Sequence, residues 1–174
     1  MVRRVVTGHN ADGKSVFVSD GPVDPVIPMF TRIWATEELP TFPDDGSDPI
    51  PLGTVAGFFP AKPGGIRFWL FTLPPHSSGR DTPQDEEVIA QVEAILPGMA
   101  AVMDPGDPGM HTTDTIDLEV ILSGRVTLEL DDGAEKEMGP GDIVIQNGTR
   151  HRWHNRESEP AVMAAILIGS HRKG

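Results

Sequence analysis

The sequence predicts an all-β fold in which many short strands surround one core, with a single helical segment. Nineteen glycines and 17 prolines among 174 residues supply many turn positions. After Gly109 the chain becomes a series of short alternating runs, each bounded by a turn signal such as Ser123-Gly124 or Asp132-Gly133. A chain of this length is long enough for one domain with its own core and too short for two ordinary ones.

The first 75 residues show strand-like runs and one proline-rich region. Residues 2–35 contain the runs VRRVV, KSVFVS and MFTRIWA, which predict edge strands or an extended arm. Residues 37–63 are rich in Pro, Asp and Gly, which suits an irregular surface loop, and we assign no function to them. Residues 65–73 alternate, contain several aromatic residues and end at Pro74-Pro75, so they predict a core strand.

The single helix is predicted over residues 82–97. Thr82 can cap its start, Pro83 suits the first helical position, and acidic residues fill the first turn. Apolar residues recur at helical spacing before Pro97-Gly98, at Val88, Val92, Ile95 and Leu96. We expect this stripe to lie on the barrel or on a partner subunit.

The C-terminal runs predict a meander of closely spaced strands, and one run carries a polar stripe. Residues two apart in a strand share a face. The polar side chains on one face are His111, Thr113, Thr115, Asp117 and Glu119. The apolar side chains on the other are Ile116, Leu118, Val120 and Leu122. Alternation alone leaves open whether the polar stripe is the wet face of an antiparallel sheet or lines a pocket.

Composition excludes several classes of partner and site. The formal net charge of −12 would repel a phosphate backbone or an anionic membrane surface. No cysteine is present, which removes disulfides and thiolate ligands and fits a reducing compartment. No run approaches the roughly 18 apolar residues of a membrane span, so we expect a cytoplasmic protein. Phosphate-binding glycine loops and serine nucleophile elbows are also lacking, so no nucleotide or flavin cofactor is indicated.

Two motifs resemble those of the cupin family. The first cupin motif runs His, one residue, His, three or four residues, Glu, six residues, Gly. Here His111 takes the first place, Thr113 the second, Asp117 the Glu place and Gly124 the last, so two of the four positions are substituted.

The second cupin motif resembles the segment from Gly141 through His151 to Asn155. Its closing pattern of Gly, two residues, His, three residues, Asn is complete. Gln146-Asn147 stands where a proline is usual, and the stretch from Gly141 to His151 is one residue shorter than the usual pattern. The resemblance covers about residues 105–169.

The resemblance implies a jelly-roll barrel, the cupin double-stranded β-helix, with its core over residues 105–169. Residues 1–75 would form an N-terminal strand-rich arm and further strands, and residues 82–97 one short helix, all within a single domain over 1–174. It also implies that the polar stripe faces a pocket inside the barrel.

The same resemblance implies a metal site formed by His111, Asp117 and His151. Two imidazoles and a carboxylate suit iron(II), manganese, nickel or zinc, with positions open for water and substrate. Two departures weaken the site: Thr113 removes a nitrogen donor, and Asp117 reaches less far than Glu. A metal ion is therefore a possible cofactor, and its absence stays open.

Further residues of the same region are candidates for catalysis and ligand binding. Glu119 can move protons, with its pKa raised by the neighbouring carboxylate of Asp117, or it is a solvated surface residue. Trp153 can form an apolar wall for a planar ligand, or it only fills the barrel end. Thr113 and Gln146 are the other candidate binding residues. The remaining histidines are expected not to be ligands, namely His9, His76, His154 and His171.

Two functions of different classes follow. The first is a metal-dependent enzyme, an oxygenase, isomerase or lyase acting on a small organic substrate. The second is a metal-free protein that binds a small ligand without catalysis, which the Thr113 substitution favours. Cupins often pair through barrel edges, and the apolar stripe from Ile116 to Leu122 needs a cover, so a homodimer is expected under either function.

Overall fold

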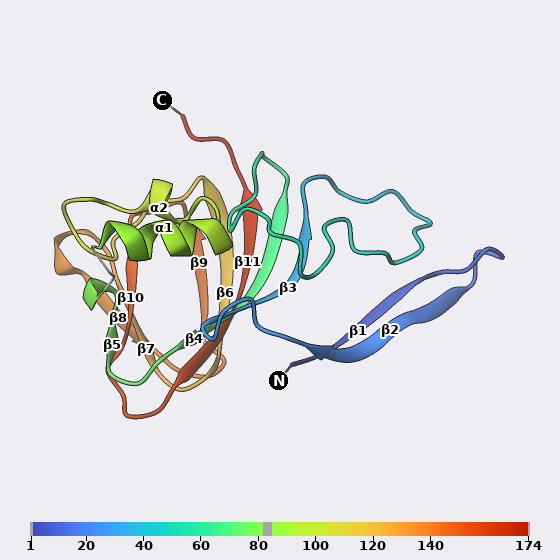
Figure 1. The fold of residues 1–174 in the computed structure, drawn as a ribbon. Helices are drawn as coiled ribbons and strands as arrows, with labels where there is room; N and C mark the ends of the chain where they lie inside the picture. Colours follow the sequence, from blue (N-terminus) through green and yellow to red (C-terminus); the bar gives the residue numbers. More distant parts are fainter. Residues whose placement is uncertain (1, 82–84, 174) are drawn as a thin grey trace.

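Two antiparallel sheets close a barrel in the computed structural model, which describes residues 2–81 and 85–173 (Figure 1). The five-stranded sheet has the order β3-β4-β11-β6-β9. Its strands are β3 (Phe30–Thr36), β4 (Ile66–Leu73), β11 (Ala161–Gly169), β6 (Thr115–Ser123) and β9 (Ile143–Asn147). The four-stranded sheet has the order β5-β10-β7-β8. Its strands are β5 (Ser77–Ser78), β10 (Arg152–Asn155), β7 (Val126–Glu129) and β8 (Glu135–Met138). The prediction of an all-β barrel is confirmed.

The path of the C-terminal strands differs from the predicted meander. Among the strands from β6 to β11, β7 and β8 are the one consecutive pair that is hydrogen-bonded, whereas β6 and β7, and likewise β10 and β11, lie in different sheets. The chain therefore crosses between the sheets repeatedly, which is the jelly-roll arrangement. Turn signals in the sequence mark where strands end, but they do not say which sheet the next strand joins.

The N-terminal arm is a two-stranded hairpin of β1 (Val2–His9) and β2 (Ser15–Val23) that extends away from the barrel (Figure 1). Two contacts anchor the hairpin to the loop between β3 and β4. The backbone N–H of His9 donates to the carbonyl oxygen of Asp44 at 2.8 Å, and Arg4 forms an ion pair with Asp48 at 2.7 Å. Phe17 near its tip is 79% exposed. Residues 37–63 contain no strand or helix, as predicted.

The helix α1 (Glu86–Ile95) is shorter than the predicted segment 82–97. Asp85 caps it, accepting hydrogen bonds from the backbone N–H groups of Glu87 and Val88. Thr82 and Pro83 lie outside the described residues. A second short helix, α2 (Met99–Val102), was not predicted, and it follows Gly98, whose φ of 95° suits glycine.

The second half of α1 contributes to the core, where Val92 packs against the buried cluster. Leu96, just beyond the helix, is 1% exposed and packs with Phe58 and Trp69, whereas Val88 and Ile95 are 37% and 43% exposed. The predicted apolar stripe thus contacts the barrel over part of its length only. Within the described residues, no helix is both long and apolar enough to cross a bilayer.

Candidate functional site

The interior of the barrel receives the polar face of β6. Thr115, Asp117 and Glu119 are 3%, 3% and 4% exposed, and Ile121 completes the inward row at 1%. The alternate apolar residues point outward, and Leu122 is 50% exposed. This is the reverse of an ordinary sheet, where the polar face is wet. The interpretation of the stripe as a solvated face is therefore wrong.

The outer face of this region is apolar and uncovered in the single chain. Four large side chains of β6 and β9 are at least 37% exposed, namely Ile116, Leu122, Ile143 and Ile145. The predicted homodimer concerns this face and stays a prediction.

His111 and His151 face each other near one end of the barrel. They form an isolated antiparallel bridge in which each backbone N–H donates to the other residue's carbonyl oxygen at 3.0 Å. Their ring centroids are 4.1 Å apart. This bridge joins positions 111 and 151, which are 40 residues apart in the sequence.

Hydrogen bonds fix the tautomer of both rings. Nδ1 of His111 lies 3.0 Å from the carbonyl oxygen of Gly109, and Nδ1 of His151 lies 2.9 Å from that of Thr149. Because a carbonyl oxygen only accepts hydrogen bonds, each Nδ1 carries a proton, and each Nε2 of the neutral ring keeps a lone pair. Burial lowers the pKa of His111, and burial followed by repulsion from His111 lowers the pKa of His151 to about 3. Both rings are therefore neutral at physiological pH and have the tautomer that metal-binding histidines use.

Gly109 holds the first of these histidines close to a neighbouring turn. Its φ is +80°, and a Cβ atom at this position would lie 1.8 Å from the carbonyl oxygen of Gly79. Only glycine fits such an approach. The backbone on which the His111 ring rests is thus fixed by contact with residues 79–81.

Asp117 and Glu119 are buried beside apolar residues of β11. Across the sheet they lie opposite Leu167 and Ala165 of β11. Burial raises the pKa of Asp117 to about 6, and burial followed by the charge of Asp117 raises the pKa of Glu119 to about 8. Oδ1 of Asp117 and Oε2 of Glu119 are buried without a hydrogen-bond partner. At neutral pH Glu119 keeps its proton, and each residue has an oxygen free for a ligand.

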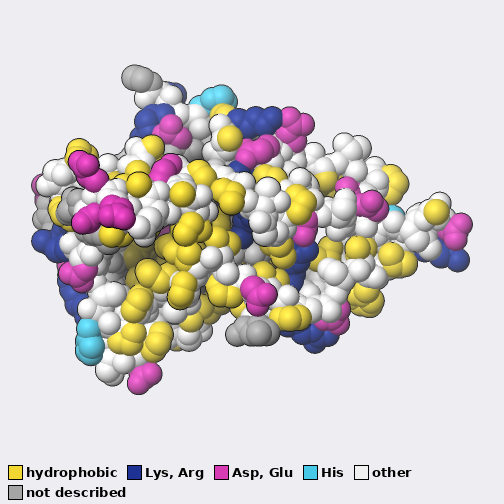
Figure 2. Space-filling view, viewed as in Figure 1, with side chains coloured by type: hydrophobic (Ala, Val, Ile, Leu, Met, Phe, Trp, Pro, Cys, Tyr) yellow, Lys and Arg dark blue, Asp and Glu magenta, His cyan; other side chains and the backbone are white. Residues whose placement is uncertain are grey.

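A cavity of about 380 Å³ opens beside His111. Most of its wall is apolar and comes from Met29, Phe30, Phe71, Leu73, Met103 and Trp153. Figure 2 shows hydrophobic side chains gathered below α1 on this face of the molecule. The ring of Trp153 stands edge-on to His151, with centroids 6.5 Å apart and planes at 85°. The cavity is suited to a small, largely apolar molecule.

The other two predicted binding residues do not line this cavity among the described residues. Thr113 is 1% exposed and accepts a hydrogen bond from the hydroxyl of Thr115 at 2.7 Å. Gln146 is 2% exposed and pairs with Asp117 in the register of β9 and β6. Its Nε2 donates to the carbonyl oxygen of Thr149 at 3.0 Å and to the hydroxyl of the same residue at 2.7 Å. Since the carbonyl oxygen of Thr149 also accepts the hydrogen bond from Nδ1 of His151, Gln146 orients the turn that supports this ring.

The structure brings the predicted metal ligands into one barrel but not into one compact group. Among the described residues, the group of three whose ligand atoms lie within 4.8 Å of one another is Glu129, Glu135 and His154. The triad of His111, Asp117 and His151 therefore stays a prediction.

The ligand atoms of the Glu129 group lie close enough together to hold a metal ion, but its carboxylate oxygens already accept hydrogen bonds from arginines. Glu129 accepts from Arg152 at 2.7 and 2.6 Å and from Arg80 at 2.8 Å, while Glu135 pairs with Arg156. These guanidinium groups supply the positive charge that a metal would bring. We therefore interpret the group as an ion-pair network.

His154 belongs to this network, which the sequence did not reveal. Its Nε2 lies 2.6 Å from Glu129, and its Nδ1 lies 2.9 Å from the hydroxyl of Ser78. Strand parity correctly placed His154 on the face opposite to His151. One signal in the sequence pointed to this network. Arg152 and His154 alternate along β10, and β7 ends in Glu129, so one face of these two strands carries residues that can form ion pairs.

Comparisons with known proteins agree with the two sequence motifs. A family model described as a cupin domain matches residues 98–168. A phomopsin biosynthesis cluster protein from Diaporthe leptostromiformis is 30% identical over 156 residues, which cover 88% of this chain and 70% of the relative. A cupin-domain-containing oxidoreductase from Aspergillus ruber is 25% identical over 160 residues, which cover 88% of this chain and 64% of the relative.

Solved structures of cupin proteins also match part of the chain. One is an RmlC-like protein with a double-stranded β-helix fold from Methanocaldococcus jannaschii. It is 14% identical, with a TM-score of 0.41 over 63% of this chain and 74% of that one.

Proposed function

The chain belongs to the cupin family, and from this premise we propose that its barrel is the active site of a metal-dependent oxidoreductase acting on a small, largely apolar organic molecule. Relatives named as cupin-domain-containing oxidoreductases support the reaction class. The observation that carries the proposal is the pair of neutral histidines with free Nε2 lone pairs in a barrel that also buries two carboxyl groups.

The donor set suits a divalent metal ion. Two imidazole nitrogens and a carboxylate oxygen match the ligand preferences of iron(II), manganese, nickel and zinc. The unpartnered oxygens of Asp117 and Glu119 lack the hydrogen bonds that buried oxygens normally have, and an ion would supply a partner. In this proposal His111, His151 and Asp117 hold the metal.

The roles of the remaining residues follow from their chemistry. When bound, the ion would hold a substrate oxygen and stabilise negative charge that develops on it. Glu119, buried two positions from Asp117 on the same inward face, is the residue that would transfer protons to or from the reacting molecule. Trp153 and the apolar wall of the cavity bind the body of the substrate and exclude water from it.

A second candidate function is the metal-free binding of a small ligand by the same cavity. Two observations favour it. Thr113, buried and bonded to Thr115, occupies the place of a ligating histidine. The ligand atoms of the triad also do not form a group within 4.8 Å.

Thermal unfolding of chelator-treated protein with added Ni²⁺ separates these functions. At a free metal concentration about a hundredfold above Kd, binding stabilises the folded state by about 2.7 kcal/mol. This corresponds to a rise in Tm of roughly 5–10 °C for a chain of this size. We expect His111→Ala and His151→Ala to abolish the rise.

The matched control is Glu135→Gln, which removes one member of the Glu129 group and none of the triad. It should keep the full rise in Tm. A rise that disappears only in Glu135→Gln would place the ion on the ion-pair network and contradict the proposal, and no rise in the unmodified chain would favour metal-free binding.

A further inference from the structure

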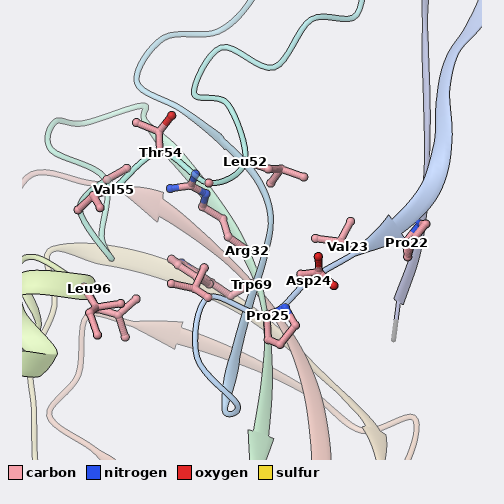
Figure 3. A pocket seen from close by; sticks show the side chains of 14 residues that line it. Pro22, Val23, Asp24, Pro25, Arg32, Leu52, Thr54, Val55, Trp69 and Leu96 are labelled. Atoms are coloured by element: carbon pink, nitrogen blue, oxygen red, sulfur yellow. The ribbon is translucent and has the colours of Figure 1, made fainter.

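A second cavity, of about 530 Å³, lies at the β3 edge of the five-stranded sheet (Figure 3). It shares no lining residue with the cavity beside His111. Its apolar walls come from Pro22, Val23, Pro25, Leu52, Val55 and Leu96. Trp69 also lines it and is held in place, since its Nε1 donates to the carbonyl oxygen of Phe58 at 3.0 Å and its ring stacks on the Phe58 ring at 4.7 Å.

Arg32 of β3 places a positive charge in this apolar cavity. The residue is 3% exposed. Its Nη2 donates to the carbonyl oxygen of Pro51 at 2.7 Å, while its Nε is buried without a partner. In Figure 3 the guanidinium points toward Thr54 and Val55 and away from Asp24. Residues 52–56 and 95–96, which are distant from β3 in the sequence, thus line the same cavity as this guanidinium group, whose Nε lacks a hydrogen bond.

The other buried arginines show what Arg32 lacks. Arg67 and Arg152, 1% and 2% exposed, each pair with a carboxylate, Glu37 and Glu129 respectively. Within the described part of the chain, Arg32 forms no ion pair. A buried charge without a partner is costly, and proteins normally pair it. The missing partner is therefore expected from outside the chain.

The charged groups near Arg32 do not satisfy it. Burial and then repulsion from Arg67 lower the pKa of Arg32. The negative charge of Asp48 raises it, by a smaller amount. Asp48 is bonded through Oδ2 to Arg4 at 2.7 Å, and its buried Oδ1 forms no hydrogen bond with Arg32 or with any other group of the described residues. Asp24 lines the cavity, yet it makes no ion pair with Arg32. The guanidinium therefore keeps Nε without an acceptor, beside a cavity whose walls are mostly apolar.

We propose that this cavity binds a small organic acid whose carboxylate pairs with Arg32 and whose apolar body lies against Trp69 and Leu52. Arg is suited to this role because its planar group can donate two parallel hydrogen bonds to a carboxylate. The volume falls within the range of small-molecule sites, and the apolar walls match a hydrocarbon chain. The site is independent of the proposed barrel chemistry.

Isothermal titration with octanoate, octan-1-ol and octylamine tests the proposal, because these probes share the hydrocarbon and differ in the head group. Hydrogen bonds to charged groups correspond to about a 10- to 100-fold gain in affinity. We expect octanoate to bind at least about tenfold more tightly than octan-1-ol, and octylamine to bind most weakly. Equal binding of the acid and the alcohol, or no binding of octanoate, would overturn the proposal.

Two variants locate the binding. Arg32→Met removes the charge and keeps a side chain of similar length, so the preference for octanoate should vanish while the Tm of the free protein rises, since an unpaired buried cation is lost. Leu52→Trp keeps Arg32 and fills the cavity, so octanoate binding should fall at least tenfold with little change in Tm. An octanoate preference that survives in Arg32→Met, or octanoate binding that is unchanged in Leu52→Trp, would place the acid elsewhere and refute the assignment.

Discussion

The Glu129→Gln variant is expected to lose about 3–5 kcal/mol of unfolding free energy, because it breaks a fully buried ion pair and leaves Arg152 with the more exposed Asp107, at 2.5 Å, as its carboxylate partner. Glu129 and Arg152 are each 2% exposed and share two hydrogen bonds of 2.7 and 2.6 Å. His154 would lose its charged acceptor as well. Urea unfolding at pH 7, followed by circular dichroism, measures the loss.

The control for this prediction is Glu137→Gln, which breaks an ion pair with Arg125 in which both side chains are 59% exposed. Exposed pairs contribute at most about 1 kcal/mol. The hydrogen bonds from Arg152 hold the pKa of Glu129 at about 2, below its ordinary 4.5. Its stabilisation is therefore present above pH 4.5 and is lost as the pH falls toward 2, a loss that the Glu129→Gln variant should lack. Equal losses in the two variants at pH 7 would contradict the account.

Glu119 is expected to make the metal-free protein less stable as the pH rises. Its pKa in the folded state, about 8, lies above its ordinary 4.5. Between these values the unfolded chain releases the proton and the folded chain keeps it, so the unfolding free energy falls as the pH increases. For Glu119 alone, the total loss by pH 9 is on the order of 5 kcal/mol.

The Glu119→Gln variant removes this loss. Glutamine has the shape of the protonated acid and does not titrate, so the variant should match the unmodified protein at pH 5 and exceed its stability at pH 8.5 by several kcal/mol. Urea unfolding of chelator-treated protein at several pH values tests this, with Glu137→Gln as the exposed control. If Glu119→Gln and the unmodified protein respond identically to pH, Glu119 is ionised or solvated in the folded state.

Much of the barrel was predictable because its signals are local. The alternation in residues 115–123 and the turns that bound it need no information from distant parts of the chain. Turn glycines gave the strand ends, but not the crossing of the chain between sheets. The short strand Ser77–Ser78 carries too few residues for a periodic signal, and it forms only by pairing with β10.

The buried polar face of β6 was predictable from the sequence, whereas the distances between the candidate ligands were not. Strand parity placed Asp117 and Glu119 on one face, and both are buried inside the barrel. The contact between His111 and His151 depends on a bridge between positions 111 and 151, which are 40 residues apart, so no local pattern predicts it. The sequence could not identify Arg32 as buried and unpaired. An arginine in a strand is common, and its burial and ion-pair partners depend on the tertiary structure.

The metal content of the untagged protein tests the central claim most directly. Elemental analysis of the purified chain and of a His111→Ala/His151→Ala double variant, with folding checked by circular dichroism, compares the site with and without its imidazoles. The account predicts close to one divalent metal ion per chain, absent from the folded double variant and retained by Glu135→Gln. A chain that stays metal-free after incubation with iron(II), manganese, nickel and zinc would contradict it.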